Sequence, residues 1–227
     1  VGRVTDISFD VRDILANVGL QEVITYRLTT PEREALLLPP GTPKDDRPYV
    51  TLANPIVADR VNMRHSVLAS VLEAAVNNLR FTDRVAVFEV GAVYLASEEG
   101  VLPDEPRRLA VVMTGPRQPE GWQASDREAM DFYDLKGVVE ALLTGLHLQE
   151  TKLEPAEHPS FRPGRTAQLT VDGKAVGWFG ELHPLVAQAY LNASGGAAGA
   201  PLLAADFDLE LILASVSERF ITRPVSR

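Results

Sequence analysis

A single carboxylate, Glu89, stands in the otherwise apolar stretch RVAVFEVGAVYLAS (84–97). Burying an unpaired charge among valines is costly, so this side chain needs a cation or hydrogen-bond donors. The favoured interpretation is a structural ion pair, with Arg64 as the expected partner. The competing interpretation is a catalytic acid or a metal ligand, because perturbed carboxyl groups cluster at functional sites.

The histidines are the other residues that could do chemistry. His158 and His183 each precede a proline, and Glu157 and Glu181 lie close to them in the sequence. Two imidazoles and two carboxylates are ligands that zinc accepts. Their spacing matches no short metal-binding motif, so roles in turns and in hydrogen bonding are favoured.

Other chemical signatures are weak or missing. The sequence holds no G-x-x-x-x-G-K-[ST], no G-x-G-x-x-G and no G-x-S-x-G pattern. The loop HPSFRPGR (158–165) carries two arginines that could bind an anion, although a solvated loop tethering the neighbouring strands is the favoured interpretation. The chain has no cysteine, which excludes disulfides, thiolate metal sites and a cysteine nucleophile.

Composition bounds the class of protein. The 227 residues carry a formal net charge of −9, which argues against nucleic-acid binding as the main independent activity. The sequence shows no apolar run of about 18 residues and no signal-peptide pattern, so we expect a cytoplasmic protein without a membrane anchor. The first residue is valine, and we expect the sequence to be a fragment of a longer protein.

Periodicity then predicts the elements that position these residues. In the first half we expect a helix capped by Ser8 and ended by Gly19, a strand over 21–28, a short helix from Pro31, a strand over 49–54, and a helix from Ser66 to about Leu79.

The stretch 84–97 is expected to be the central strand, with helices packed on both of its nearly apolar faces. A returning strand from Arg107, a helix over 131–145, a hairpin over 168–182, a short helix after His183 and a strand over 202–211 follow. Strands joined by hairpins predict an α+β fold with an antiparallel or mixed sheet flanked by helices.

Six segments, taken in this order, resemble the catalytic-like core module of the bacterial phenylalanyl-tRNA synthetase beta chain: GLQEVITYRLTTP (19–31), NPIVADRVNMRHSVLASVLEAAVNNL (54–79), VAVFEVGAVY (85–94), DFYDLKGVVEALL (131–143), HPSFRPGRTAQL (158–169) and GWFGELHP (177–184). The resemblance covers nearly the whole chain. It implies a core domain over 1–215 and a linker over 216–227 that leads to a C-terminal anticodon-binding domain. The family's tRNA-binding and editing parts would lie upstream.

The resemblance also implies a class II synthetase fold, whose active site uses three motifs. The first is an interface helix and strand ending at a proline, which places these residues at a subunit interface: Val11, Ile14, Val18, Ile24, Tyr26 and Pro31. The second, F-R-x-[DE], puts Leu95 where its arginine should be. The third, G-x-G-x-E-R, puts Leu211 at its arginine and Asp206 and Asp208 at its glycines, so that only Glu210 is kept.

These replacements imply a site without the cations that grip ATP, because a leucine cannot neutralise phosphate oxygens. The family then predicts a non-catalytic assembly module, inactive alone and without a cofactor or metal of its own. It would pack on the synthetase alpha subunit in an (αβ)₂ assembly that uses ATP and Mg to join phenylalanine to tRNA. We expect tRNA to bind mainly through other domains.

Two alternatives stay open at this stage. The chain could be an independent enzyme or ligand-binding domain that uses Glu89, His158 and His183. It could also be an active ligase in which Arg107 or Arg108 replaces the missing cation near Leu95. The position of Glu89, either open to a pocket or sealed against an arginine, separates the first alternative from the assembly module.

Overall fold

The computed structural model describes residues 2–54, 60–97, 102–122, 127–195 and 198–216. These residues form six helices, which are α1 (Gly2–Asn17), α2 (Pro31–Ala35), α3 (Val67–Asn78), α4 (Phe132–Gly145), α5 (Pro184–Ser194) and α6 (Leu209–Ala214). They also form nine strands, which are β1 (Gln21–Glu22), β2 (Leu28–Thr29), β3 (Asn62–Met63), β4 (Val85–Ala92), β5 (Arg107–Thr114), β6 (Thr151–Pro155), β7 (Phe161–Val171), β8 (Lys174–Leu182) and β9 (Leu203–Asp208).

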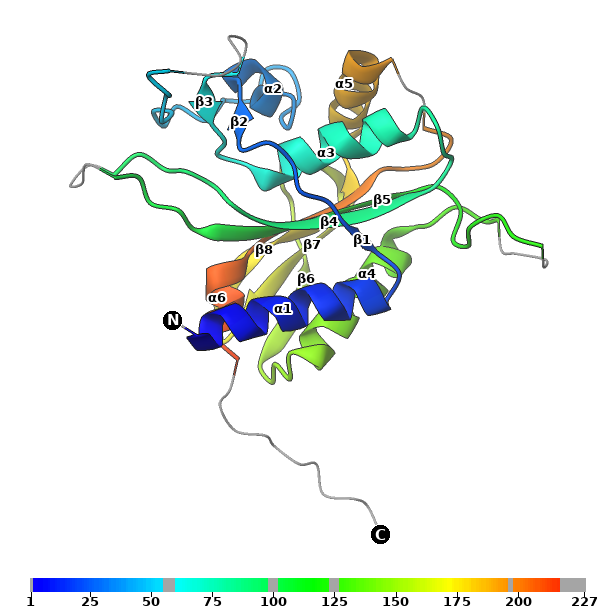
Figure 1. The fold of residues 1–227 in the computed structure, drawn as a ribbon. Coiled ribbons are helices and arrows are strands. Elements are labelled where there is room, and N and C mark those ends of the chain that lie inside the picture. The colour runs from blue at the N-terminus through cyan, green and yellow to red at the C-terminus, as the bar shows by residue number, and fades with distance from the viewer. Residues whose placement is uncertain (1, 55–59, 98–101, 123–126, 196–197, 217–227) are drawn as a thin grey trace.

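A seven-stranded sheet organises the molecule, in the order β1-β4-β5-β9-β8-β7-β6 (Figure 1). Every neighbouring pair is antiparallel except β1 and β4, which are parallel. Strands β2 and β3 pair separately. The predicted α+β class with an antiparallel, mixed sheet is therefore confirmed. The prediction that β4 is central is wrong, because β9 takes the middle position and β4 lies next to the edge.

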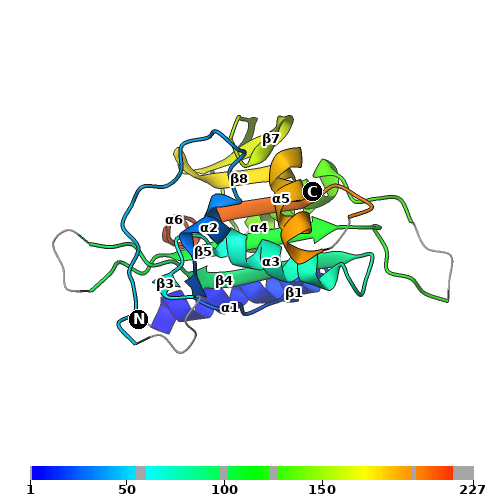
Figure 2. The same cartoon turned by 90° about the horizontal axis from the view of Figure 1, so that it is seen from above.

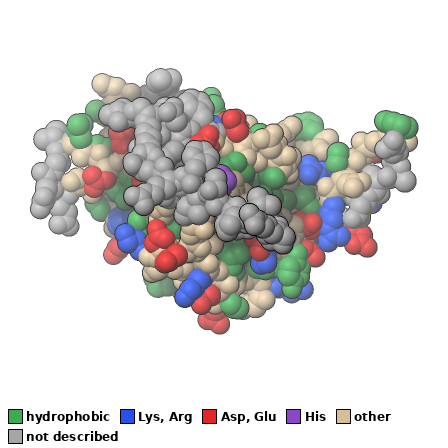
Figure 3. All heavy atoms as spheres, turned by 90° about the horizontal axis from the view of Figure 1, so that it is seen from below, with side chains coloured by type: hydrophobic (Ala, Val, Ile, Leu, Met, Phe, Trp, Pro, Cys, Tyr) green, Lys and Arg blue, Asp and Glu red, His purple; other side chains and the backbone are tan. Residues whose placement is uncertain are grey.

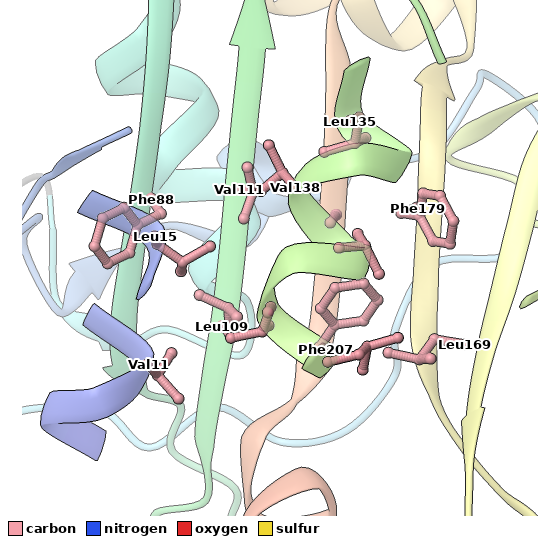
Figure 4. Close-up of a cluster of buried hydrophobic side chains, with 14 of the residues drawn as sticks. Val11, Leu15, Phe88, Leu109, Val111, Leu135, Val138, Leu169, Phe179 and Phe207 are labelled. Atoms are coloured by element: carbon pink, nitrogen blue, oxygen red, sulfur yellow. The ribbon is translucent and has the colours of Figure 1, made fainter. Parts of the chain in front are cut away.

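Helices cover both faces of this sheet. Helices α3 and α5 lie on one face, and α1, α4 and α6 lie on the other (Figures 1 and 2). The side chains of β4 alternate between the two resulting cores: Ala86 and Phe88 pack with α1 and α4, whereas Val85 and Val87 pack with α3. Figure 4 shows the first of these cores, to which α1, α4 and five strands contribute apolar side chains.

Local capping signals correctly predicted several elements. The Ser66 hydroxyl accepts a hydrogen bond from the Ala69 amide at the start of α3. Asp131 forms a reciprocal capping box at the start of α4, and His183 caps α5. Asp172 and Gly173 have φ of 47° and 75°, as the predicted turn of the β7–β8 hairpin requires.

Two predictions near the N-terminus are corrected. Helix α1 begins at Gly2, so Ser8 lies within it and does not cap it. Of the strand expected over 21–28, only β1 and the first residue of β2 are extended strand. The interruption has a specific cause, since the Thr25 amide and hydroxyl donate to Glu89 Oε2, at 3.3 and 2.6 Å, and not to a strand ladder.

Two further strands are shorter than expected. Within 49–54, Thr51 makes only an isolated bridge to Asn62. The strand expected over 202–211 ends at Asp208, because the Asp208 carboxylate accepts a hydrogen bond from the Leu211 amide and starts α6. Strand β6 was not predicted from the sequence.

No helix within the described ranges combines the length and the apolar character that crossing a membrane requires.

Candidate functional site

A cleft of about 530 Å³ opens on the face of the sheet that carries α3 and α5. Its walls come from α2 and the following loop, from the first residues of α3, and from β5, β8 and β9. Leu95, the residue that the resemblance placed at the arginine of the second motif, lines this cleft together with Asp206 and Asp208. The structure therefore brings together three of the positions that the resemblance assigned to the nucleotide-binding motifs, but not Glu210 or Leu211.

Arg108 lines the same cleft as Leu95, and its guanidinium already forms ion pairs with two aspartates. Its Nη2 lies 2.9 Å from Asp206 Oδ1, and its Nη1 lies 3.5 Å from Asp208 Oδ2. The antiparallel register of β5 and β9, in which Arg108 faces Asp208, fixes this arrangement. Asp206 and Asp208, which the resemblance placed at the glycines of the third motif, thus neutralise the arginine that was the candidate replacement.

Arg107 points to a different partner. Its Nε lies 2.7 Å from Glu210 Oε1, and hydrogen bonding to Arg107 holds the pKa of Glu210 below its usual value. Neither residue is among those that line the cleft. Leu211 is half-buried against the core under α1 and α4, so this position of α6 faces away from the cleft.

The cleft lining is acidic. Its acidic residues are Glu32, Glu34, Asp45, Asp206 and Asp208, and its lysine and arginine residues are Lys44, Arg47 and Arg108. Besides the pairing of Arg108, Arg47 Nη2 lies 2.6 Å from Asp45 Oδ2. A triphosphate entering this cleft would meet more negative than positive side chains, which disfavours binding.

A hydrogen-bonded cluster closes the α2 side of the cleft. Glu34 accepts hydrogen bonds from the Tyr49 hydroxyl at 2.9 Å and from the amides of His65 and Ser66 at 2.9 and 3.1 Å. Burial raises the pKa of Glu34. The His65 ring stacks on Tyr49 with centroids 3.9 Å apart, and burial lowers the pKa of His65.

The His65 ring also lies 3.2 Å from Asp45 through its Nδ1. Hydrogen bonding to Arg47 is the main reason that the pKa of Asp45 is lowered to about 2. Sequence reasoning missed this cluster, because its members come from three separate segments and no local spacing links them.

Glu89 lies outside the cleft in a sealed ion pair. Arg64 Nη2 lies 2.8 Å from Glu89 Oε1, and the two side chains are 1% and 4% exposed. Arg64 also donates to the Thr25 hydroxyl at 2.9 Å and to the Ala92 carbonyl at 2.9 Å. A Cβ on Gly91 would come within 2.2 Å of Arg64 Nη2, so glycine makes room for the guanidinium.

The two candidate histidines do not join Glu89. His158 lines the cleft, 4.7 Å from the Trp178 ring, and its Nδ1 accepts a hydrogen bond from the Ser160 amide. Burial lowers the pKa of His158. His183 Nδ1 accepts a hydrogen bond from the Leu185 amide as the cap of α5, away from the cleft lining.

Neither glutamate near these histidines completes a metal site. The prediction of a loop over 158–165 is wrong for its second part, because residues 161–165 belong to strand β7. Arg162 and Arg165 of this strand contact Glu181, at 2.5 and 3.7 Å. The described residues include no group of three or more histidine, cysteine, aspartate or glutamate side chains placed to hold a metal.

The residues assigned to a subunit interface divide into two sets. Val18, Ile24, Tyr26 and Pro31 are exposed, with Ile24 at 91% and Tyr26 at 79%. Val11 is fully buried within this chain, and Ile14 is half-buried and packs close to Gly145 of α4. Only the first set offers side chains to a partner.

Comparison with known proteins shows the family to which this chain belongs. The family described as the phenylalanyl tRNA synthetase beta chain CLM domain matches residues 4–193, and the chain belongs to this family.

Individual relatives agree with this assignment. The phenylalanine–tRNA ligase beta subunit of Symbiobacterium thermophilum is 42% identical over 187 residues, covering 81% of this chain and 20% of that protein. The Chromobacterium violaceum beta subunit is 37% identical over 218 residues, covering 96% and 25%. The Bacillus cereus beta subunit is 39% identical over 176 residues, covering 77% and 21%. The chain therefore spans a fifth to a quarter of the length of these relatives.

Proposed function

We propose that this chain is a non-catalytic assembly domain of a phenylalanine–tRNA ligase beta subunit. It packs on the catalytic alpha subunit in an (αβ)₂ holoenzyme, which uses ATP and Mg to attach phenylalanine to tRNA in the cytoplasm. Its fold is of the class II synthetase type, with the domain spanning 1–215 and residues 216–227 leading to an anticodon-binding domain. Transfer RNA binds mainly through other domains. The beta-subunit name of the relatives and the mainly antiparallel sheet support this proposal.

The main observation in support of a non-catalytic role is that Arg108 is paired with Asp206 and Asp208. Adenylate formation needs cations over the phosphates, where negative charge develops in the transition state. Leu95 supplies no charge, and the Arg108 guanidinium is held by Asp206 and Asp208. Losing one such donor costs about 10²–10³ in rate, so losing two leaves no useful activity.

An independent enzyme built on Glu89, His158 and His183 is not favoured by this geometry. Glu89 is 3% exposed and its oxygens are held by Arg64 and Thr25. His158 lies in the cleft and His183 caps a helix, so the three side chains do not face one substrate.

Calorimetry with ATP and Mg tests the proposal directly. The isolated chain should show no ATP binding, whereas the cognate alpha subunit in the holoenzyme serves as the positive control. Sub-millimolar ATP affinity in the isolated chain would refute the non-catalytic role.

A second experiment tests the partner. A full-length beta subunit with this domain is titrated with the cognate alpha subunit, and complex formation and aminoacylation are followed together. Both should rise to a plateau at equimolar subunits. Aminoacylation by either subunit alone at the holoenzyme rate would contradict the proposal.

A further inference from the structure

The cleft beside α2 and α3 has the size and the mixed lining of a site for a small molecule. Its volume of about 530 Å³ lies within the range of about 300–1,000 Å³ that is typical of ligand sites. Its apolar and aromatic lining comes from α3, from β7 and β8 and from the residues after β4, and includes Leu68, Val93, Leu95, Phe161 and Trp178. A molecule that fills the cleft must therefore present an apolar body as well as polar groups.

The charged part of the lining is acidic. Five acidic side chains face three basic ones, and two of the basic ones, Arg47 and Arg108, are already paired with lining aspartates. On the opposite face of the molecule, which α1, α4 and α6 cover, acidic and basic side chains are interspersed (Figure 3). The negative field of the cleft attracts a cation and repels an anion.

His65, which also lines the cleft, holds a polar atom without a partner. Its side chain is 2% exposed, and no described residue forms a hydrogen bond with its Nε2 atom. Leaving a buried polar atom unpaired is costly, because the atom has lost its hydrogen bonds to water and gained none from the protein. This observation is independent of the acidic lining, and it points to a bound molecule that supplies the partner.

The surroundings of the His65 ring determine what that partner must be. Asp45 Oδ2 lies 3.2 Å from His65 Nδ1, and hydrogen bonding to Arg47 lowers the pKa of Asp45 to about 2. The ionised carboxylate can only accept a hydrogen bond, so Nδ1 carries the proton of the ring. Burial lowers the pKa of His65, and the neutral ring therefore has a bare lone pair at Nε2.

The missing partner of Nε2 is thus a hydrogen-bond donor. The Pro48 carbonyl beside the ring is itself an acceptor and cannot take this role. A donor that also carries positive charge satisfies both observations, because it pairs with Nε2 and is attracted by the acidic lining.

We propose that this cleft binds a small organic cation, an ammonium or amidinium group on an apolar body, whose N–H group donates to His65 Nε2. The aromatic and apolar lining packs against the body of the ligand, and aromatic rings such as Trp178 favour a cation further. The inference goes beyond the assembly role and does not depend on it, because the cleft belongs entirely to this chain. It assigns the cleft a ligand of opposite charge to a nucleotide.

Benzamidine and benzamide test the charge of the ligand, because they have nearly the same shape and only benzamidine is a cation. Saturation-transfer NMR titrations of each probe with the full-length protein that contains this chain measure the two affinities. Benzamidine should bind about tenfold more tightly or better, since a charged donor strengthens the hydrogen bond and the acidic lining adds attraction. Equal affinities, or no saturation transfer to benzamidine at millimolar concentration, would overturn the inference.

His65→Phe tests the hydrogen bond to Nε2. Phenylalanine keeps a ring that can stack on Tyr49, as the His65 ring does at 3.9 Å, but has no acceptor. The variant should weaken benzamidine binding about tenfold, and its melting temperature shows whether it is folded. An unchanged affinity in the folded variant would overturn the assignment of Nε2.

Asp206→Asn tests the acidic lining without altering His65. It removes one negative charge and releases Arg108 from one of its two partners, so benzamidine binding should weaken about fivefold. Asp172→Asn is the matched control, because Asp172 lies in the β7–β8 turn outside the cleft lining and asparagine tolerates its φ of 47°. Equal weakening by both variants would show an effect of the overall charge and overturn the inference.

The proposed holoenzyme separates a free ligand from a side chain of another polypeptide. A free ligand requires benzamidine to bind the holoenzyme as tightly as it binds the beta subunit alone. Loss of binding only in the holoenzyme would show that another subunit fills the cleft, and would overturn the small-molecule ligand. The ATP calorimetry described above is a separate measurement, so a failure of the proposed function is not confused with a failure of this inference.

Discussion

At the scale of single residues, the Arg64–Glu89 pair shows how this sequence accommodates buried charge. Both side chains are nearly inaccessible to solvent, and Thr25 and the Ala92 carbonyl complete their hydrogen bonding. Gly91 leaves the space that the guanidinium fills. The pair joins the irregular segment before β2 to strand β4, so charge and not a strand ladder fixes that segment.

Removing one partner of this pair should be strongly destabilising. Glu89→Leu leaves the Arg64 guanidinium buried without its counter-charge, and we expect a loss of about 3–5 kcal/mol in the free energy of unfolding. Urea denaturation of the isolated domain measures this loss.

Two comparisons make this experiment specific. Lys136→Ala breaks an exposed pair with Glu140 and should cost about 0.5 kcal/mol or less. The double variant Arg64→Met with Glu89→Leu should recover part of the stability, because no charge is left unpaired. A double variant less stable than Glu89→Leu alone would argue against charge burial as the cause.

A second residue-scale prediction concerns pH. Hydrogen bonding to Arg47 lowers the pKa of Asp45 to about 2 in the folded protein, against about 3.9 in an unfolded chain. The folded state thus favours the ionised form, so the stabilisation by Asp45 is present above about pH 4 and is lost as the pH falls towards 2.

The variant Arg47→Ala should raise the pKa of Asp45 and weaken this dependence. Carboxyl-carbon NMR titration follows the pKa of Asp45, and urea denaturation at several pH values between about 2 and 5 follows the stability. An unchanged titration of Asp45 in the variant would show that Arg47 is not the cause of the shift.

At the scale of elements, replacing each of two glycines by alanine is expected to change the free energy of unfolding in opposite directions. A Cβ on Gly177 of β8 would come within 2.0 Å of the Asp206 carbonyl oxygen on β9, so Gly177→Ala must push two paired strands apart. Gly137 lies on the exposed side of α4 with nothing within 4 Å of an added Cβ.

We expect Gly177→Ala to lower the free energy of unfolding by about 1–3 kcal/mol or more, and Gly137→Ala to raise it by about 0.5–1 kcal/mol. Thermal and urea unfolding of both variants measures the contrast. A lower free energy of unfolding for Gly137→Ala would contradict the prediction, because the structure shows nothing within 4 Å of the added Cβ.

The same scale shows what could be predicted from the sequence. Helices α3 and α4 and the β7–β8 hairpin carry their own caps, apolar periodicity and turn residues, so local patterns were sufficient. The segment 23–27 has strand-like alternation, but the Thr25 hydroxyl donates a hydrogen bond to Glu89, which lies 64 residues further along the sequence. A contact of that kind leaves no local signal.

The cleft was predictable only in part. The family motifs located Leu95, Asp206 and Asp208, which do line one cavity. The pairing of Arg108 depends on the register between β5 and β9, and the position of Leu211 depends on where Asp208 starts a helix. Neither follows from residue types alone, because both need the three-dimensional pairing of strands.

At the scale of the whole molecule, the exposed residues after α1 predict how assembly depends on apolar contact. Ile24 and Tyr26 stand free of this chain's own core, and we propose that the alpha subunit covers them. Ile24→Asp should weaken the alpha–beta complex about tenfold or more, since a carboxylate would be buried in the contact.

Analytical ultracentrifugation of full-length subunits measures this affinity. Leu185→Ala, which alters another exposed apolar side chain on α5, is the matched control and should have little effect. Equal affinities for Ile24→Asp and the unmodified beta subunit would exclude this surface from the interface.

The pairing of Arg108 with two aspartates limits what a single substitution in the cleft can achieve. An arginine introduced at position 95 would enter a cleft that Asp206 and Asp208 also line, and a glycine introduced at 206 or at 208 would still leave Arg108 one acidic partner. No one of these substitutions supplies two free cations, so a triphosphate site in this cleft would require several coordinated changes.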